Sequence, residues 1–476
     1  MTDSVVVVGG GLAGLVAARH LAAGGADVTL YEQRETVGGR VRTRERDGFT
    51  LDRGFQVLFT AYPAVRRELD LDALDLRTFA PGACICRPGK RSILSDPLRE
   101  PTTLLASLRN DEVPLSDKAR TLLLRQDLRK RSEGDIFTGP DQSIREYLSE
   151  WGFSDDYVDN FVAPFYGGIT LDRSLSTSKR VFEYTFKALS AGKIGVPADG
   201  MAAIPEQLAD RAREAGAEIR TDVEVTDVSD PASTGGHEIE ITDGGTVTSA
   251  DSADDPTGGG DDAGPGDSTD AGAEAGARTD ATGTDGTVTV ETTAGTVDAD
   301  AVVVAGDPKT ARELTGVSSI PTDAVSSVTQ HYSVPAGPDL GTDRKLLLNA
   351  KDAAPNAVVP MSEVAPEYAP PGRELLTATF LGEESMDAAD DELATATRRA
   401  LAAWYPERDF EDVEVVATDR IEFAQFAQPP GVHDDLPSAR TAGGNTYLAG
   451  DYTGWSSINA AMKSGRLAAS AVLGDR

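Results

Sequence analysis

Three glycines and one glutamate near the start of the chain have the types and spacing needed to bind a dinucleotide. Gly9-x-Gly11-x-x-Gly14 directly follows four valines, and Glu32 stands 18 positions beyond Gly14. The first glycine of such a motif permits a sharp turn, the second lets the backbone approach a pyrophosphate, and the third lets a helix pack closely on a strand. An acidic side chain at the distance of Glu32 accepts hydrogen bonds from ribose hydroxyls. The alternative is a glycine-rich turn in an α/β domain that binds no nucleotide.

The neighbouring residues supply the elements that must position this chemistry. Residues 5–8 are four β-branched residues, which is typical of a strand buried on both faces of a parallel sheet. Apolar residues at helical spacing then predict a helix over 12–23, and residues 27–31 predict a second strand. The first turn of the helix, which includes Ala13, would offer free N–H groups and the positive end of its dipole to phosphates.

The same stretch lacks the features of a secretory leader or a membrane anchor. It begins with Met1-Thr2-Asp3, which is acidic where a leader needs basic residues, and glycines interrupt its apolar run. A membrane-spanning helix needs about 20 consecutive apolar residues, and the sequence contains no such stretch. We therefore expect neither a leader nor a transmembrane segment.

A second motif follows the acid: Glu32-x-Arg34-x-x-x-Gly38-Gly39-Arg40. With this motif the chain resembles the flavin-dependent superfamily that includes amine oxidases, protoporphyrinogen oxidases and plant-type carotenoid desaturases. The resemblance implies FAD as the cofactor, with the element from Arg34 to Gly39 beside it and Arg40 near its phosphates. A guanidinium suits that position because its planar fork pairs with two phosphate oxygens. Alternatively, Arg40 is a solvated surface cation.

The far end of the chain resembles the second flavin motif of the same superfamily. The sequence "LAGDYTGWSSINAAMKSGR" predicts a short strand at 447–449 and a final helix. The resemblance implies that Gly450 and Asp451 contact the ribityl or phosphate region, and that the amides of Ile458 and Asn459 face a carbonyl of the isoalloxazine ring. The family commonly has Met-Glu-Gly-Ala where this chain has Ile-Asn-Ala-Ala, so the approach of the backbone to the ring differs here.

Further positions are assigned by resemblance between these two motifs. Val223, which follows a predicted helix over 204–215, would offer its backbone to the adenine. Residues 299–308 would return the chain to the nucleotide domain as a strand. Gln56, Trp455 and Ser456 would lie near the flavin ring.

The motifs together predict an α/β fold with two domains. A Rossmann-like FAD-binding domain of the GR2 type, with a β-meander, would be formed by residues 1–60, 195–315 and 442–476. An α+β substrate domain would be formed by residues 61–194 and 316–441. Two domains suit the chain of 476 residues, because single cores seldom exceed about 250 to 300 residues.

The charge of the chain is strongly acidic. Seventy-eight Asp and Glu against 45 Lys and Arg give a formal net charge of −33. Such a surface repels nucleic acid and itself, so it favours a location where salt screens the carboxylates. We therefore predict a protein of a halophilic, high-salt cytoplasm. The alternative is an ordinary acidic protein with one acidic segment.

Part of this charge lies in residues 230–286, which are mostly Asp, Gly, Thr, Ala and Ser. Because this composition cannot bury enough apolar surface to offset the entropy of ordering, it predicts a disordered insert, either a tolerated surface loop or a tether. The flanking sequences "HEIEIT" and "TVTVET" alternate with period two and predict neighbouring strands of the meander.

Other reactive residues do not form a recognisable centre. Cys84 and Cys86 are the only cysteines and the four histidines are scattered, which predicts neither a disulfide framework nor a metal site. On a strand, the two cysteines would share one face and serve packing. Where several relatives have a lysine that holds water near the flavin N5, this chain has Gln330 and His331. The sequence therefore names no catalytic residue.

The function predicted from these observations is FAD-dependent dehydrogenation or desaturation of an apolar substrate, isoprenoid (carotenoid) or tetrapyrrole-like, by hydride transfer to the flavin N5. Tyr166, Tyr184 and Trp455 are the candidates to line its pocket, although each could equally be domain core. Flavin amine oxidase is the first alternative, and a non-catalytic prenyl or lipid carrier on the same scaffold is the second. Oxygen, a quinone and a protein remain open as electron acceptors. An apolar substrate would also favour transient, peripheral contact with a membrane.

Overall fold

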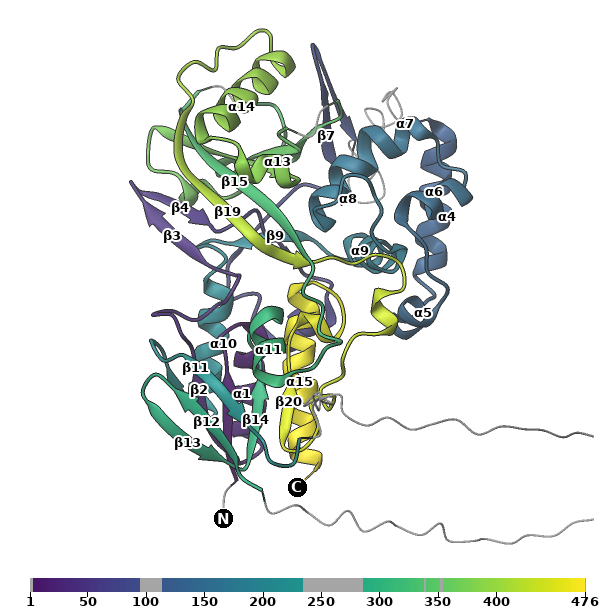
Figure 1. Cartoon of the computed structure of the whole chain (residues 1–476). Coiled ribbons are helices and arrows are strands. Elements are labelled where there is room, and N and C mark those ends of the chain that lie inside the picture. The colour runs from purple at the N-terminus through teal and green to yellow at the C-terminus, as the bar shows by residue number, and fades with distance from the viewer. Residues whose placement is uncertain (1–2, 95–113, 234–285, 338–339, 352–353, 476) are drawn as a thin grey trace, which may run out of the picture. The chain divides into compact units, whose positions relative to one another are not determined.

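A five-stranded parallel sheet carries the glycine-containing turn (Figure 1). Its order is β10-β2-β1-β14-β20, and every neighbouring pair is parallel. The strands are β1 (Ser4–Val8), β2 (Asp27–Tyr31), β10 (Glu218–Arg220), β14 (Ala301–Val304) and β20 (Thr446–Leu448). The structure, a computed structural model, describes residues 3–94, 114–233, 286–337, 340–351 and 354–475.

Valine-rich central strands explain why this sheet is buried. Residues 5–8 of β1 and 302–304 of β14 are almost fully inaccessible, as expected for strands covered on both faces. Helices α1 (Leu12–Ala23), α10 (Ala203–Glu214) and α15 (Ile458–Gly474) pack together on the sheet. The contact between α1 and α15 is very close, because a Cβ added at Gly465 would lie 2.1 Å from the carbonyl oxygen of Ala13. The first and last helices therefore share one core.

A three-stranded antiparallel meander adjoins the parallel sheet. It consists of β11 (Val225–Ser229), β12 (Val288–Thr292) and β13 (Gly295–Ala299). The predicted strand "TVTVET" corresponds to β12, whereas "HEIEIT" and residues 234–285 of the predicted insert lie outside the described residues. Helix α11 (Pro308–Thr315) follows β14, with Asp307 as its N-cap.

A seven-stranded mixed sheet forms the other large layer, in the order β19-β15-β18-β17-β16-β7-β8. Its strands are β7 (Ala83–Arg87), β8 (Lys90–Leu94), β15 (Ala324–Pro335), β16 (Leu346–Asn349), β17 (Ala357–Pro360), β18 (Arg373–Leu381) and β19 (Glu414–Phe426). Only β7 and β16 pair in parallel; the other pairs are antiparallel. Cys84 and Cys86 are buried on β7 with their sulfurs 3.8 Å apart, so they share one face. Helices α12 (Met361–Val364), α13 (Glu383–Asp387) and α14 (Asp390–Trp404) accompany this sheet.

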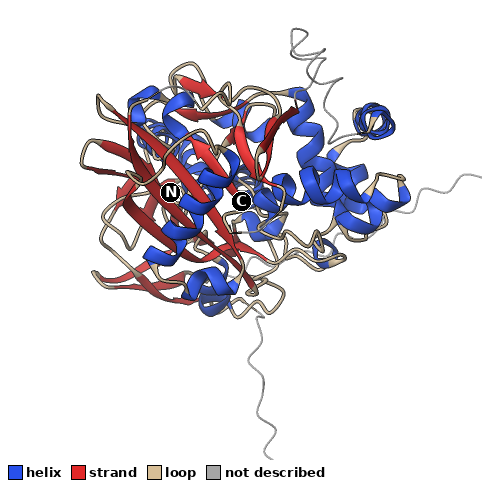
Figure 2. Ribbon diagram, turned by 90° about the horizontal axis from the view of Figure 1, so that it is seen from above, coloured by secondary structure: helices blue, strands red, loops and turns tan. Residues whose placement is uncertain are grey.

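Helices gather to one side of the strands, as Figure 2 shows from above. They are α4 (Leu115–Leu128), α5 (Glu133–Thr138), α6 (Ile144–Glu150), α7 (Asp155–Tyr157), a π-helical turn (Val158–Val162), α8 (Ala163–Thr170) and α9 (Lys179–Ala191). Ser132 and Ser143 begin α5 and α6 with capping boxes, so both helices start where the sequence provides a cap. Short elements connect the layers: α2 (Pro63–Glu68), β3 (Thr43–Arg46), β4 (Phe49–Asp52), β5 (Leu58–Phe59), β6 (Leu76–Thr78) and β9 (Ile194–Pro197).

The α/β class predicted from the sequence is confirmed. The strands of the parallel sheet and those of the seven-stranded sheet fall within the two sets of ranges given for the two domains. The division of the chain into an FAD-binding and a substrate domain stays a prediction. Within the part of the chain that the structure describes, no helix is long and apolar enough to cross a membrane.

Candidate functional site

The β1–α1 turn has the geometry that its glycines suggested. Gly9 has φ +101°, a conformation that side chains disfavour, and its N–H donates to the carbonyl of Tyr31 at 2.8 Å. A Cβ added at Gly14 would lie 2.0 Å from the carbonyl oxygen of Gly9, so only glycine lets the helix start this close to the turn. A Cβ at Gly11 would meet nothing within 4 Å. The turn is therefore closed toward the protein at Gly14 and open at Gly11.

Backbone donors at this open side have no protein partner. Leu15 donates to the carbonyl of Gly11 at 3.0 Å, which starts the hydrogen bonding of α1. Among the described residues, the N–H groups of Leu12 and Ala13 have no hydrogen-bond partner. Unpaired N–H groups and the positive end of a helix dipole form an anion site, so the donor set fits a pyrophosphate.

Glu32 lies at the end of β2 beside the turn and is only 4% exposed. Its Oε2 accepts from the N–H of Gly10 at 2.7 Å, and its Oε1 accepts from the N–H of Arg34 at 3.0 Å. Each carboxylate oxygen keeps a second lone pair, which a ribose hydroxyl could use. Val223 is also here, because its N–H donates to the carbonyl of Glu32 at 3.0 Å. This hydrogen bond occupies the amide of Val223, so its carbonyl oxygen is the group left for an adenine.

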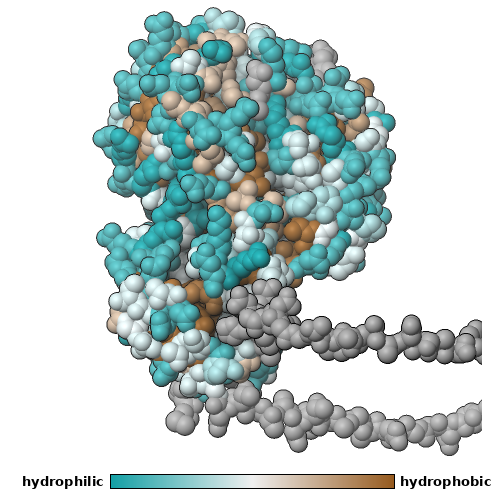
Figure 3. Space-filling view, in the orientation of Figure 1, coloured by the Kyte–Doolittle hydropathy of each residue, from teal (hydrophilic) through white to brown (hydrophobic). Residues whose placement is uncertain are grey.

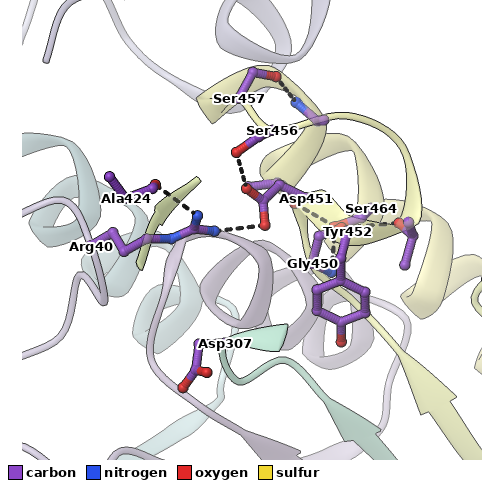
Figure 4. A network of polar contacts seen from close by, with 12 residues as sticks. Arg40, Asp307, Ala424, Gly450, Asp451, Tyr452, Ser456, Ser457 and Ser464 are labelled. Carbon is purple, nitrogen blue, oxygen red and sulfur yellow. Dashed lines mark hydrogen bonds and ion pairs between the residues drawn. The ribbon is translucent and has the colours of Figure 1, made fainter. Parts of the chain in front are cut away.

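Arg40 and Asp451 join the two ends of the chain directly (Figure 4). Nη2 of Arg40 lies 2.6 Å from Oδ1 of Asp451, and Nη1 donates to the carbonyl of Ala424 at 3.2 Å. Ser456 donates to Oδ2 of Asp451 at 2.8 Å, and Nε2 of Gln56 donates to the carbonyl of Arg40 at 3.3 Å. Residues assigned from separate motifs are thus brought together at one place.

Three segments hold this ion pair in position. Gly39 lies against the turn, since its added Cβ would be 3.3 Å from Cα of Gly11. The N–H of Gly38 donates to the carbonyl of Gly10 at 2.8 Å. On the other side, the N–H of Gly450 donates to Oγ of Ser464 at 2.9 Å, which fastens the end of β20 to α15 (Figure 4).

Arginines other than Arg40 also gather near the turn. Burial and the neighbouring charges of Arg53 and Arg34 lower the pKa of Arg42 below its usual value. Nε of Arg42 is buried and has no hydrogen-bond partner among the described residues. An anion at this place would relieve the repulsion and supply the missing acceptor. In a chain of charge −33, this local excess of cations fits the phosphates of a dinucleotide.

The N-terminus of α15 offers a second set of donors. Ser457 caps the helix by accepting from the N–H of Ala460 at 3.0 Å. The N–H groups of Ile458 and Asn459 have no hydrogen-bond partner in the described ranges. The Asn459 side chain accepts from the N–H of Ala64 at 2.9 Å and lies 3.4 Å from the hydroxyl of Tyr184. The two free amides suit a ring carbonyl, whose negative charge the helix end would stabilise.

Aromatic side chains surround this helix end. The Trp455 ring lies 4.7 Å from that of Phe137 and 4.8 Å from that of Tyr184. Tyr62 stacks on Tyr184 at 5.9 Å, and His433 meets Phe137 edge-on at 5.2 Å. We call these five residues the aromatic cluster. Sequence reasoning missed Tyr62, Phe137 and His433, because no spacing pattern relates three segments so far apart in the chain.

The structure separates Tyr166 from the other two candidates for the substrate pocket. Its ring packs against Phe165 and Phe182, in a core shared by α4, α6 and α8. Tyr184 and Trp455 instead lie in the core that includes the parallel sheet. The six aromatic residues between 161 and 186 therefore divide between two clusters rather than lining one surface.

A buried polar network lies beneath Gln56. Asp52 accepts from the N–H of Met201 at 2.8 Å and from the hydroxyl of Tyr368 at 3.2 Å, and burial raises its pKa. Nε2 of His331 lies 3.2 Å from the carbonyl oxygen of Asp52. Gln56, Asp52, His331 and Tyr368 line a cavity of about 10 Å³, large enough for one water. Oε1 of Gln56 is buried and has no hydrogen-bond partner among the described residues.

The whole length of the chain follows one family pattern. The model of the family described as flavin-containing amine oxidoreductase matches residues 12–254 and 278–473. The chain belongs to the flavin-containing amine oxidoreductase family. It is accordingly an FAD-dependent oxidoreductase that acts on a small-molecule substrate. The glycine turn, the free amides of α1 and α15 and the grouped arginines fit the cofactor of this family.

Solved structures share the fold across the full chain. A protein from Exiguobacterium sp. 255-15, provisionally named a protoporphyrinogen oxidase, is 17% identical with a TM-score of 0.66, covering 100% of both chains. Cyclohexylamine oxidase from Brevibacterium oxydans IH-35A is 13% identical with a TM-score of 0.64, covering 100% of this chain and 99% of that one.

Sequence similarity to curated proteins is local. The chain is 45% identical over 62 residues to the 4,4'-diaponeurosporene oxygenase of Staphylococcus aureus. This match spans 13% of the chain and only 12% of the length of that relative.

Proposed function

We propose that this flavoenzyme dehydrogenates an apolar substrate, of isoprenoid or tetrapyrrole type, in front of the N-terminus of α15. The observation that carries the proposal is the aromatic cluster at that helix end. Trp455 is 4% exposed and Tyr184 is 5% exposed, so the flat apolar faces of these rings are shielded from water. Such faces suit a conjugated or polyene substrate better than a charged one.

A cation already occupies one face of the cluster. Nζ of Lys463 lies 5.7 Å from the centre of the Trp455 ring, and Lys463 forms an ion pair with Glu133. An amine substrate binds to aromatic rings through its own positive charge. A cationic amine at the Trp455 ring would compete with the Lys463 ammonium, so a cationic substrate is disfavoured on the face of Trp455 that Lys463 covers.

The residues of this chain then act by binding and orientation. FAD, when bound, accepts a hydride equivalent from the substrate at N5. Asn459 fixes Tyr184 relative to the helix end. The amides of Ile458 and Asn459 would hold a carbonyl of the isoalloxazine ring and favour negative charge on it. Gln56 and His331 line the cavity of about 10 Å³ described above. Hydride transfer of this kind needs no dedicated acid or base, consistent with the lack of a recognisable catalytic triad in the sequence.

The printed names of relatives point to both candidate functions, since one full-length structural relative, cyclohexylamine oxidase, is named for an amine. The local match is to a protein named for oxidising a carotenoid, 4,4'-diaponeurosporene, and one full-length structural relative carries the name protoporphyrinogen oxidase. Amine oxidation is the second candidate. It is favoured by the tilted arrangement of Tyr184 and Trp455, whose ring planes make an angle of 60°, as two walls of a cage would.

The test is anaerobic bleaching of the bound flavin by a panel of substrates. Carotenoid precursors and porphyrinogens should remove the visible flavin absorbance, whereas primary and secondary amines should leave it unchanged. Bleaching by amines alone would overturn the proposal in favour of the second candidate. A W455L variant separates binding from chemistry, because it should retain FAD and lose the fast bleaching.

A further inference from the structure

Helix α4 exposes leucines that no other described element covers. Leu115, Leu122 and Leu123 are 67%, 49% and 59% exposed. Over the residues that the structure describes, the remaining exposed large apolar side chain is Leu467 on α15, at 46%. Three exposed leucines on one helix of 14 residues are unusual on a soluble surface, where such side chains are scattered singly.

These leucines share one face of the helix. At 3.6 residues per turn, Leu122 lies about two turns after Leu115 on the same side of the helix. Leu123 is the neighbour of Leu122, so the three leucines form one stripe. The opposite face is buried through Leu124 and Leu128, which pack in the helical core. The outward stripe is therefore not part of the folding core.

Basic residues border the stripe. Lys118 lies on one edge, and the exposed Arg129 and Lys130 follow the C-terminal end. Neither acidic residue of the helix adds a free negative charge to this face. Asp117 is fully buried and accepts a hydrogen bond from Ser154, and Asp127 forms an ion pair with Arg131. The exposed Arg129 and Lys130 make the C-terminal end of this face basic, on a chain whose net charge is −33. Hydrophilic residues predominate on the face of the molecule drawn in Figure 3.

We propose that the outward face of α4 docks the protein on a membrane surface that contains anionic lipids. An amphipathic helix with leucines on one face and Lys or Arg beside them lies in the interfacial plane of a bilayer, with its apolar side chains below the headgroups. The basic residues complement anionic headgroups, whereas the acidic remainder of the protein is repelled from them. Attachment is peripheral and reversible.

The position of α4 gives this docking a role. Helix α4 packs against α9, and Nη2 of Arg125 donates to the carbonyl of Ser190 at the end of α9 at 2.8 Å. Helix α9 carries Tyr184 of the aromatic cluster. Among the described elements, only α9 therefore lies between α4, which would contact the lipid, and the aromatic cluster. A ligand that dissolves in membranes would have a short path from the bilayer to the cluster.

The test is cosedimentation of the FAD-loaded protein with vesicles, at a salt concentration where it is folded. Vesicles of phosphatidylcholine with phosphatidylglycerol should bind the protein, and pure phosphatidylcholine should bind it more weakly. The variant L122E/L123E should reduce the partition coefficient by roughly tenfold or more, because it places charge in the apolar stripe. The variant R129E/K130E should reduce binding to anionic vesicles by a smaller factor, which grows as the salt is lowered toward the limit of stability, and leave weak binding to phosphatidylcholine unchanged.

A matched control is L467E, which introduces the same change at the exposed leucine of α15. It should bind vesicles like the wild type. Equal binding of L122E/L123E and wild type would overturn the proposal, as would loss of binding in L467E to the same degree. A dye attached through L123C should report an apolar environment only after vesicles are added. An apolar environment without vesicles would show that another segment or a second copy of the chain covers the helix.

Discussion

Two regions of the molecule are built from different kinds of contact. One is the aromatic cluster, and the other is the surroundings of the β1–α1 turn, which we call the nucleotide end because they are predicted to bind the dinucleotide. At the nucleotide end, backbone groups predominate: the carbonyl of Gly9, the amides of Leu12 and Ala13, and the carbonyl of Val223. In the aromatic cluster, side chains from five separate segments meet. Backbone geometry depends on local sequence, whereas side-chain clusters depend on the complete fold. The two regions should therefore respond differently to substitution.

The largest effect should come from lowering salt, which acts on both regions together. At about 0.01 M salt the screening length rises to roughly 30 Å, so the carboxylates of a chain with charge −33 repel one another across the molecule. We expect unfolding in a single transition, reported by circular dichroism and by the fluorescence of the buried Trp404 and Trp455. An unchanged spectrum would refute the high-salt interpretation. Two separate transitions would show that the two regions fold independently.

A pair of alanine substitutions tests the nucleotide end. G14A should destabilise the protein by more than about 3 kcal/mol, because its Cβ would lie 2.0 Å from a backbone oxygen. G11A should change stability by less than about 1 kcal/mol, because its Cβ meets nothing within 4 Å, yet it should weaken FAD binding by at least about tenfold. Urea unfolding of the apoprotein and flavin titration measure the two effects. Full FAD affinity in G11A would contradict the assignment of the pyrophosphate to this turn.

Acid should weaken the aromatic cluster through His433. Burial lowers the pKa of His433 to about 4, and both ring nitrogens lack a hydrogen-bond partner in the described part of the chain. The folded state therefore binds this proton less readily than the unfolded chain. Its contribution to stability is complete above the unfolded pKa of about 6.5 and is lost as pH falls toward 4, by up to about 3 kcal/mol.

The control for this pH dependence is H433F, which retains a ring against Phe137. The difference in unfolding free energy between wild type and H433F should change over that pH range and stay constant above it. A constant difference at every pH would show that His433 titrates as it does in the unfolded chain.

The smallest effect should distinguish the two aromatic groups. W455L should slow anaerobic flavin reduction by the best substrate by about tenfold, because a wall of the cluster is removed. Y166F should leave the rate within about twofold, since Tyr166 packs in a separate core. Equal slowing by both variants would contradict the division of the aromatic residues into two groups.

The strand, turn and helix of residues 5–23 could be predicted from the sequence for a physical reason. A buried strand, a turn and a helix leave periodic signals, and the requirement for glycine at positions 9 and 14 follows from backbone crowding. The ion pair of Arg40 with Asp451 was not predicted as such, although resemblance placed both residues beside the cofactor. This ion pair depends on the pairing of β20 with β14, a tertiary contact that no local sequence pattern indicates.

The aromatic cluster could not be predicted in the same way. Tyr166 and Tyr184 are neighbours in a stretch rich in aromatic residues, but they belong to different cores. Phe137 lies on a helix whose capping box is visible in the sequence, yet nothing local indicates that its ring meets Trp455. The leucine stripe of α4 was missed because exposure is decided by which face the rest of the fold covers.

The close packing of Gly465 on Ala13 has a consequence for biosynthesis. β1 stands in the middle of its sheet, with β14 and then β20 on one side, and α15 completes the layer over α1. Because α15 is synthesised long after β1 and α1, the helical layer over the sheet stays incomplete until α15 has left the ribosome. Nascent chains that stop before this helix would lack Gly465, the residue that packs on Ala13. Cofactor capture would then report that α15 has been synthesised.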